Sequence, residues 1–387
     1  MRAPAAAWRC LTTCILAGAV LAGCSSSEPR EQPAPVPGVS GDAEIREIWS
    51  RRVGEGMDGQ YLFLSPGIHE ETVYAATQNG YITAYNARNG RRDWWEKLDE
   101  RLLGGVGVDA DHLYVVTRNG ELIALSHEGK EQWRTSLPNE ALVPPQSNGR
   151  YVVVQTIDGE LLAFSQSNGN RRWQYDSNMP VLSFRGNATP WIDGSRVIAG
   201  FDNGRVVALD VNSGAVQWEQ RLAQPAGRTE LERLVDVDSS PHVVDDTVYV
   251  SAYQGSVTAL ELRSGEERWS RELSSLEAPA VTEEQVVAAG ADGTLVGFER
   301  ASRSELWRHR ELAWRQPTAP VALGNHAVVG DFEGYLYAVD ATDGTIDSRV
   351  LVDDEGLRSD PIRFRDRVIV FGNGGWLASY HVREGDR

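Results

Sequence analysis

The sequence predicts an all-β fold made of repeated four-stranded sheets, and three observations support this prediction. A turn glycine recurs at intervals of 38 to 51 residues along most of the chain. A small residue follows each of these glycines by four positions, and an apolar residue comes next. In five repeats a second turn glycine precedes a tryptophan by four residues. A period near 40 with four short strands per repeat is typical of a β-propeller blade. Eight copies therefore predict eight blades.

Each first-turn glycine marks one repeat, and the eight are Gly80, Gly120, Gly159, Gly204, Gly255, Gly293, Gly334 and Gly375. The tryptophans that follow are Trp94, Trp133, Trp173, Trp218, Trp269 and Trp307. The small residues allow neighbouring sheets to approach, and the large indoles fill the outer gaps between them. The sixth repeat has Arg303 in place of the second glycine, and the seventh has Ser348 in place of tryptophan.

The fourth repeat illustrates how one blade is built. Short β-branched runs at Val197–Gly200 and Arg205–Asp210 are separated by Asp202-Asn203-Gly204, and Ala215–Trp218 opens the next strand. Glycine and asparagine provide the positive φ that tight turns require. A single such sheet has two apolar faces, so we expect the sheets to stack around an axis and bury both.

The eighth repeat ends before any tryptophan, and the N-terminal segment supplies what is missing. Ile45–Ser50 has the character of a strand and contains Trp49. We expect this strand to pair with the last repeat and close the ring, with Trp49 in place of the absent tryptophan. The predicted propeller therefore spans residues 43–387.

The first 42 residues have a different composition. Residues 1–23 have two arginines followed by the apolar run Leu11–Val20, as in a signal peptide, and Leu21-Ala22-Gly23-Cys24 resembles a bacterial lipobox. We expect cleavage before Cys24 and lipidation of that residue, with Ser25 favouring the outer membrane. Residues 24–42, rich in Ser, Pro and Gly, are expected to form a flexible tether, of which 18 residues would extend about 60 Å.

The charge and the reactive residues exclude several classes of function. The formal net charge is −17, which disfavours binding to nucleic acid or to an anionic membrane surface. All three cysteines lie in the first 24 residues, and the seven histidines show no metal-ligand spacing. No nucleophile, phosphate or dinucleotide motif is present. We therefore expect no catalytic residue, no cofactor and no metal site.

The repeats resemble those of pyrroloquinoline quinone (PQQ) dehydrogenases, which leaves a quinoprotein enzyme as one alternative. Those enzymes use a vicinal disulfide and long insertions, and this chain has no cysteine after Cys24. A second alternative is a glycan-binding propeller of the periplasm.

The two longest intervals between repeats, 45 and 51 residues, are consecutive and contain Ser177–Pro190 and Arg221–Pro241. Both segments lead into a blade, so we expect them on one side of the ring. Arg185 and Asp236 occupy equivalent positions in neighbouring repeats, with Leu182 and Phe184 beside Arg185. Apolar residues next to opposed charges are typical of an interface centre. A locally packed loop with a structural ion pair is the alternative.

The lipobox, the proline-rich tether, the eight repeats and the segments 181–186 and 229–238 together resemble the BamB family, lipoproteins of the outer-membrane β-barrel assembly (BAM) complex. The resemblance implies a non-catalytic scaffold that binds the periplasmic POTRA domains of BamA through Leu182, Arg185, Asp236 and Asp238. Phe184 stands where the family has a second leucine. Through BamA the chain would join the rest of the complex, and a further hypothesis is that its strand edges bind unfolded outer-membrane proteins by β-augmentation.

Overall fold

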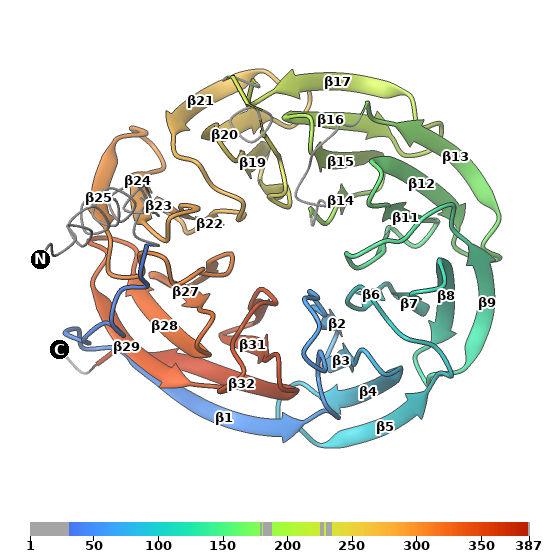
Figure 1. Ribbon diagram of the computed structural model, residues 1–387, viewed down its shortest axis with the longest axis horizontal. Helices are drawn as coiled ribbons and strands as arrows, with labels where there is room; N and C mark the ends of the chain where they lie inside the picture. The colour runs from blue at the N-terminus through green and yellow to red at the C-terminus, as the bar shows by residue number, and fades with distance from the viewer. Residues whose placement is uncertain (1–30, 179, 181–187, 225–227, 230–233, 386–387) are drawn as a thin grey trace, which may run out of the picture. The chain divides into compact units, whose positions relative to one another are not determined.

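The computed structural model describes residues 31–178, 180, 188–224, 228–229 and 234–385, and its compact unit begins at Pro33. Within these residues the chain forms eight four-stranded antiparallel sheets arranged as the blades of a ring (Figure 1). In seven blades the strands follow one another from the inner to the outer edge of the ring, as in the order β2-β3-β4-β5. The predicted all-β fold and the predicted eight blades are confirmed.

The strands of the first four blades are β2 Gly67–His69, β3 Thr72–Ala76, β4 Tyr81–Asn86, β5 Arg92–Lys97, β6 Gly107–Val108, β7 His112–Val116, β8 Glu121–Ser126, β9 Glu131–Ser136, β10 Gln146–Ser147, β11 Tyr151–Gln155, β12 Glu160–Ser165, β13 Arg171–Asp176, β14 Trp191–Ile192, β15 Arg196–Phe201, β16 Arg205–Asp210 and β17 Val216–Arg221. Those of the last four are β18 His242–Val244, β19 Thr247–Ser251, β20 Ser256–Glu261, β21 Glu267–Glu272, β22 Ala280–Val281, β23 Gln285–Ala289, β24 Leu295–Glu299, β25 Glu305–His309, β26 Val321–Leu323, β27 His326–Gly330, β28 Tyr335–Asp340, β29 Ile346–Leu351, β30 Ile362–Phe364, β31 Arg367–Phe371, β32 Trp376–Arg383 and, as outer strand of the eighth blade, β1 Glu44–Arg52.

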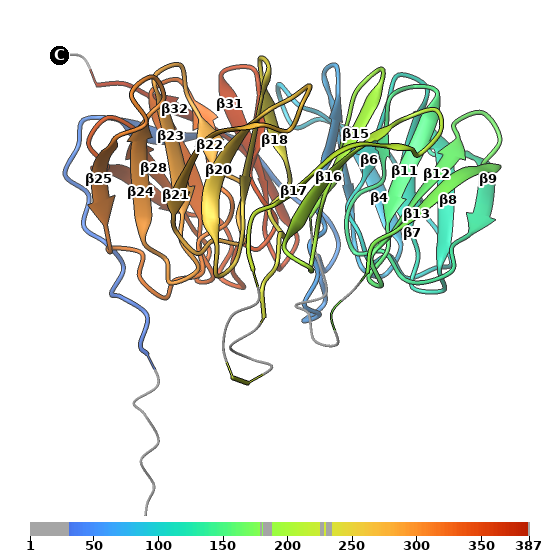
Figure 2. The same cartoon turned by 90° about the horizontal axis from the view of Figure 1, so that it is seen from above.

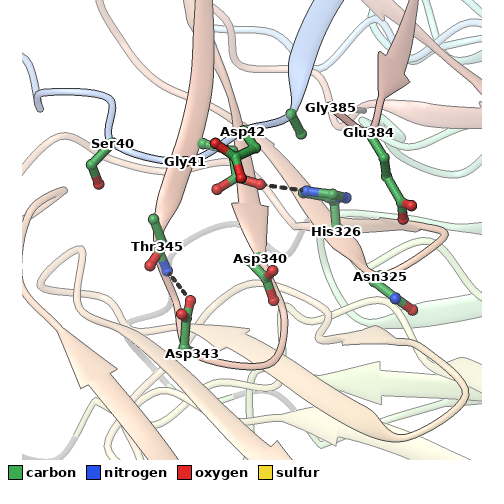
Figure 3. Close-up of a pocket in the computed structure, with 12 residues that line it drawn as sticks. Ser40, Gly41, Asp42, Asn325, His326, Asp340, Asp343, Thr345, Glu384 and Gly385 are labelled. Atoms are coloured by element: carbon green, nitrogen blue, oxygen red, sulfur yellow. Dashed lines mark hydrogen bonds and ion pairs between the residues drawn. The ribbon is translucent and has the colours of Figure 1, made fainter. Parts of the chain in front are cut away.

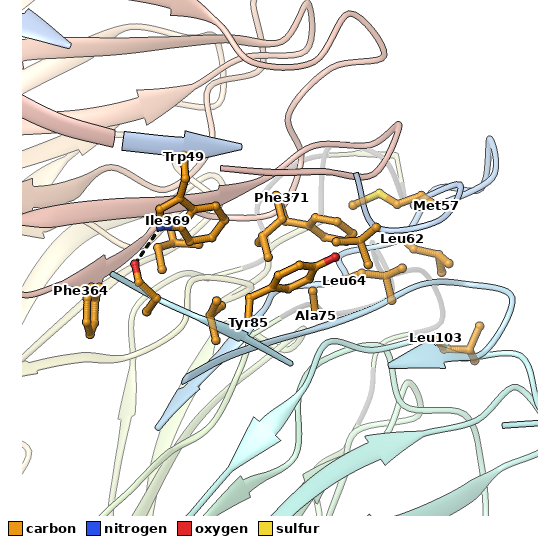
Figure 4. Close-up of a cluster of buried hydrophobic side chains, with 14 residues drawn as sticks. Trp49, Met57, Leu62, Leu64, Ala75, Tyr85, Leu103, Phe364, Ile369 and Phe371 are labelled. Atoms are coloured by element: carbon orange, nitrogen blue, oxygen red, sulfur yellow. Dashed lines mark hydrogen bonds between the residues drawn. The ribbon is translucent and has the colours of Figure 1, made fainter. Parts of the chain in front are cut away.

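The N-terminal strand closes the ring as the sequence predicted. β1 pairs antiparallel with β32, and its register places Ile45 opposite Val382 and Trp49 opposite Ser379. Trp49 is 4% exposed and belongs to a core cluster between the eighth and first blades, where it lies near Ile369 and Tyr85 (Figure 4). Residues that are far apart in sequence therefore share one blade, and the ring has no open seam.

The tryptophans dock across the gap between blades. The Nε1–H of Trp49 donates to the carbonyl of Ala87 in the first blade, at 2.9 Å. Five further tryptophans make the same contact with the next blade, with donor–acceptor distances of 2.6 to 3.1 Å, namely Trp94, Trp133, Trp173, Trp218 and Trp307. Buried indoles need such a partner for their N–H group. Each bond therefore joins two blades.

The docked indole also explains the second-turn glycines. Gly90 has a φ of 66°, and a Cβ built on it would lie 2.6 Å from the ring of Trp49. The corresponding glycines of other blades stand in the same relation to the tryptophan of the preceding blade, as Gly169 does to Trp133. A side chain at these positions would meet both backbone strain and the indole.

The two irregular repeats keep the ring intact by other contacts. Arg303 retains a φ of 67° and donates to the carbonyl of Arg268 at 3.0 Å, while Trp269 packs on Phe298, with the ring centroids 6.0 Å apart. In the seventh blade the hydroxyl of Ser348 accepts a hydrogen bond from the backbone N–H of Ile45 at 3.1 Å. The serine thus contacts the closing strand where an indole would have docked.

Residues 33–42, which the sequence assigned to the tether, lie against the ring instead. The N–H of Ala34 donates to Ala313 O and Ser40 N donates to Ile346 O, at 2.8 and 3.1 Å. The carbonyl of Ala34 accepts from the guanidinium of Arg315, which is buried and also bonded to Asp331. We call residues 33–42 the strap. Composition indicated disorder, but two backbone hydrogen bonds and the charge-assisted bond from Arg315 hold the strap in place.

The two ends of the ring differ in what they carry. One end has the first-turn glycines and the segments that join each blade to the next, as shown by the bond from Leu98 N to Gly80 O. We call this end the connection rim and the other, with the second-turn glycines, the opposite rim. In the side view of Figure 2, the blue strap and the segment that follows β17 both leave the ring at the connection rim. Among the described residues no helix has the length and apolarity needed to span a membrane.

Replacing Trp49 by alanine tests the docking interaction. Trp49→Ala removes a buried indole and its hydrogen bond across the closing seam, so we expect a loss of about 3–5 kcal/mol in the free energy of unfolding, measured by denaturant titration. Trp95→Ala is the matched control because Trp95 is 50% exposed, and its effect is expected within about 0.5 kcal/mol of zero. Equal losses in the two variants would contradict a special role for the docked ring.

Candidate partner-binding site

The two long connections predicted to form the site lie between β13 and β14 and between β17 and β18. Leu182, Phe184 and Arg185 lie outside the described residues. Asp236 and Asp238 are described, as are the ends of both connections. The described part of the predicted site therefore consists of those ends and the two aspartates.

A hydrogen bond joins the two connections. The backbone N–H of Thr189, at the end of the first, donates to the hydroxyl of Ser240, at the end of the second, at 2.9 Å. The start of the first connection is held as well, because the Asn203 amide donates to Ser177 Oγ and Asn178 O at 2.8 and 3.1 Å. Both connections thus lie on the connection rim between the third and fifth blades, as their positions in the repeat predicted.

The end of the second connection, residues 234–240, is inserted between two blades of the ring, and we call this segment the wedge. Val235 and Val237 are buried in the core cluster between the fourth and fifth blades, and Val237 N donates to Phe201 O at 3.3 Å. On the other side Tyr253 N donates to Asp236 O at 2.7 Å in an isolated antiparallel bridge. The segment around Asp236 is therefore fixed by contacts with two blades, even though it belongs to no strand.

Three carboxylates converge beside this wedge. Oxygens of Asp202, Asp236 and Asp238 lie within 4.8 Å of one another, and the two predicted residues are only 0% and 8% exposed, respectively. Like charges this close, and buried, require a positive charge or hydrogen-bond donors nearby. Three oxygen donors suit either a guanidinium or a hard cation. Asp202 was not predicted as a site residue, because Asp202-Asn203-Gly204 has the pattern of a turn.

A cavity of about 350 Å³ opens between the third and fourth blades at the same place. Its lining includes Pro180 and Asn178 from the first connection and Val235 from the second. Its wall carries the ion pair of Arg205 with Glu219. The described ends of the connections thus border a hollow with both apolar and charged walls, as is common in protein interfaces.

Two other clusters among the described residues contain histidine and carboxylates, although the spacing in the sequence predicted no such group. Oxygens and ring nitrogens of Asp109, Asp111 and His112 lie within 4.8 Å of one another. The Asp109 carboxylate already accepts from the hydroxyls of Tyr114 and Ser147, at 2.6 and 2.5 Å. Burial opposes its ionisation, but these hydrogen bonds and two from backbone N–H groups leave the pKa of Asp109 lowered. This cluster caps the turn between β6 and β7 of the second blade, and Ser147 links it to the third blade.

The other cluster lies in a cavity of about 460 Å³ where the strap passes the seventh blade (Figure 3). His326 Nε2 lies 2.7 Å from Asp347 Oδ2, and Asp340 completes the group. Asp347 packs so closely on Gly41 that no side chain fits at that position. These residues therefore seat the strap beside the blade.

The ring, its docked tryptophans and the two joined connections define an eight-bladed β-propeller of PQQ-like repeats. A family model described as outer membrane protein assembly factor BamB matches residues 78–309 and 257–387. The chain belongs to the BamB family.

Curated relatives of that name align with nearly the whole chain. The protein from Marinobacter adhaerens is 44% identical and covers 95% of both chains, and that from Pseudomonas aeruginosa is 38% identical over 97% of this chain and 99% of its own. The crystal structure of BamB from Moraxella catarrhalis has a TM-score of 0.80 at 27% identity, covering 87% of this chain and 99% of that one. A quinohemoprotein alcohol dehydrogenase from Comamonas testosteroni, with a TM-score of 0.67 at 13% identity, shares the fold alone.

A substitution at Gly200 tests whether this residue leaves the space that the wedge occupies. A Cβ on Gly200 would lie 2.4 Å from Val237 O, so Gly200→Val should displace the segment that carries both aspartates and cost about 1–3 kcal/mol of stability. Gly194→Ala is the control because no atom lies within 4 Å of its Cβ position. We expect a lowered thermal midpoint and faster hydrogen exchange at residues 234–240 in Gly200→Val only. Normal exchange there would mean that Gly200 does not hold the wedge.

Proposed function

We propose that this chain is a non-catalytic scaffold of outer-membrane protein assembly, which binds the POTRA domains of BamA through the two connections described above. The relatives that cover almost its whole length are named outer membrane protein assembly factors. The observation that carries the proposed site is the meeting of the two connections, joined through Thr189 and Ser240, on one rim of a rigid ring. A rigid scaffold lowers the entropic cost of ordering a binding loop.

The three buried carboxylates fit a specific role in this proposal. The proposal pairs Asp236 and Asp238 with the guanidinium of Arg185, which occupies the equivalent position of the neighbouring repeat in the sequence. Because the aspartates are buried, we assign them to positioning and the neighbouring Leu182 and Phe184 to apolar contact with BamA. Removing one partner of a buried, hydrogen-bonded charge pair typically costs about 2–5 kcal/mol of binding.

Co-purification with BamA tests this assignment. Arg185→Ala is expected to reduce the BamA recovered with the chain by at least tenfold in moderate salt, since it removes the cation that the proposal pairs with Asp236 and Asp238. Arg91→Ala is the matched control, because Arg91 is an exposed arginine on the opposite rim. Wild-type recovery with Arg185→Ala, or an equal loss with Arg91→Ala, would overturn the proposed site.

The proposal includes an anchor in the periplasmic face of the outer membrane through lipid on Cys24. The first backbone hydrogen bond of the strap is at Ala34, about ten residues after Cys24, and ten residues would reach roughly 35 Å if fully extended. This is little more than half of the 60 Å expected from composition. The strap leaves at the connection rim, so a short anchor restrains the proposed binding site close to the membrane.

Cys24→Ser tests the anchor. We expect the wild-type chain to incorporate labelled palmitate and to sediment with outer membranes, and the variant to take no label and to appear in the soluble periplasmic fraction when BamA is depleted. The thermal midpoint should not change, because Cys24 precedes the compact unit. An unlabelled wild-type chain would contradict the anchor.

A further inference from the structure

Two adjoining cavities open on the ring axis at the connection rim. They measure about 230 and 390 Å³ and share Tyr61, Phe63, Leu276 and Glu277. Their other walls come from segments that lead into the fifth, seventh and eighth blades, including Asp238, Pro317 and Asp360. Residues from blades on opposite sides of the ring meet only at its centre, so these cavities form the mouth of the channel.

One wall of the channel mouth is aromatic and exposed. Tyr61 is 70% exposed and meets Phe63 edge to face, with ring centroids 5.6 Å apart. Phe63 is fixed by a backbone bridge to Gly104. The guanidinium carbon of Arg358 lies 4.1 Å from the Tyr61 ring centroid, which shows that this ring accepts a cation. Exposed aromatic side chains beside a cavity are typical of binding sites.

The floor of the smaller cavity is acidic, with Asp238, Glu277 and Asp360 in its lining. The Asp360 carboxylate accepts from Ala319 N at 2.9 Å. Burial raises the pKa of Asp360 to about 6, and burial together with the charges of Asp360 and Asp238 raises the pKa of Glu277 well above its usual value. Cations that enter this cavity would relieve the repulsion among the three groups.

Charge and shape select one class of ligand. Among the described residues, Glu355 and Arg358 also line the larger cavity, so the linings of the two cavities together contain four carboxylates and one cation. Anions are disfavoured there, and aromatic walls beside carboxylates match a guanidinium or ammonium group carried on an apolar stem. We infer that the channel mouth binds an extended peptide segment that inserts an arginine or lysine side chain flanked by aromatic residues. The inferred site shares Asp238 with the second connection, whereas Tyr61, Glu277 and Asp360 lie outside both connections and are not part of the proposed BamA site.

Fluorescence anisotropy tests the inference on the full-length, detergent-solubilised chain. The probe is a labelled pentapeptide with one arginine between two phenylalanines and a glycine at each end. The double variant Glu277→Gln/Asp360→Asn should weaken binding at least tenfold at pH 7.5, and replacing arginine by citrulline in the peptide should do the same. The double variant Glu96→Gln/Asp99→Asn changes the net charge equally at exposed positions and should bind as wild type. Binding that ignores these changes would overturn the inference.

The pH dependence adds a second criterion. Because the carboxylates of Asp360 and Glu277 must be ionised to attract a cation, the affinity for the peptide should rise between pH 5 and pH 7.5 in wild type and stay flat in the Glu277→Gln/Asp360→Asn variant.

Tyr61→Ala removes an exposed ring without touching the acids, so it should lower the affinity for the peptide several-fold and leave the thermal midpoint unchanged. Stronger binding of a neutral glycan than of the peptide would reassign the site to sugars. The Glu277→Gln/Asp360→Asn variant should still recover BamA, which separates failure here from failure of the proposed function.

Discussion

The ring depends on a tryptophan from one blade that reaches across to the next. The indole donates to a backbone carbonyl and lies over a glycine that has no room for a side chain, as Trp49 does over Gly90. This contact joins sheets whose apolar faces cannot be buried alone. Because it recurs around the ring and is repeated at the closing strand, the scaffold is stiff enough for irregular segments to be added to it.

Those irregular segments are where specificity arises. The blades differ little in the length of their strands, whereas the connections into the fourth and fifth blades are long, and their ends are held by Thr189, Ser240 and the buried valines of the wedge. The strap leaves the ring at the same rim, and the channel mouth opens there as well. A single end of the propeller therefore combines the N-terminal end of the strap, the proposed site for BamA and an acidic, aromatic cavity.

The periodicity of the sequence was sufficient to predict the fold but not to predict all residues of the site. Local patterns predicted the blade count, the antiparallel strands of the fourth repeat and the place of Trp49, since turns and docking recur at fixed spacing. The strap was missed because its docking depends on Arg315, 281 residues away from Ala34. Asp202 and the channel acids were missed for a related reason: residues from different repeats become neighbours only once the ring has closed.

Hydrogen–deuterium exchange of the chain with and without the POTRA domains of BamA tests most directly whether the breaks in the repeat form the partner site. We expect added protection at residues 177–190 and 222–241, with no change at the second-turn glycines of the opposite rim. Protection confined to the opposite rim or to the outer strands, with both connections unaffected, would contradict the central claim.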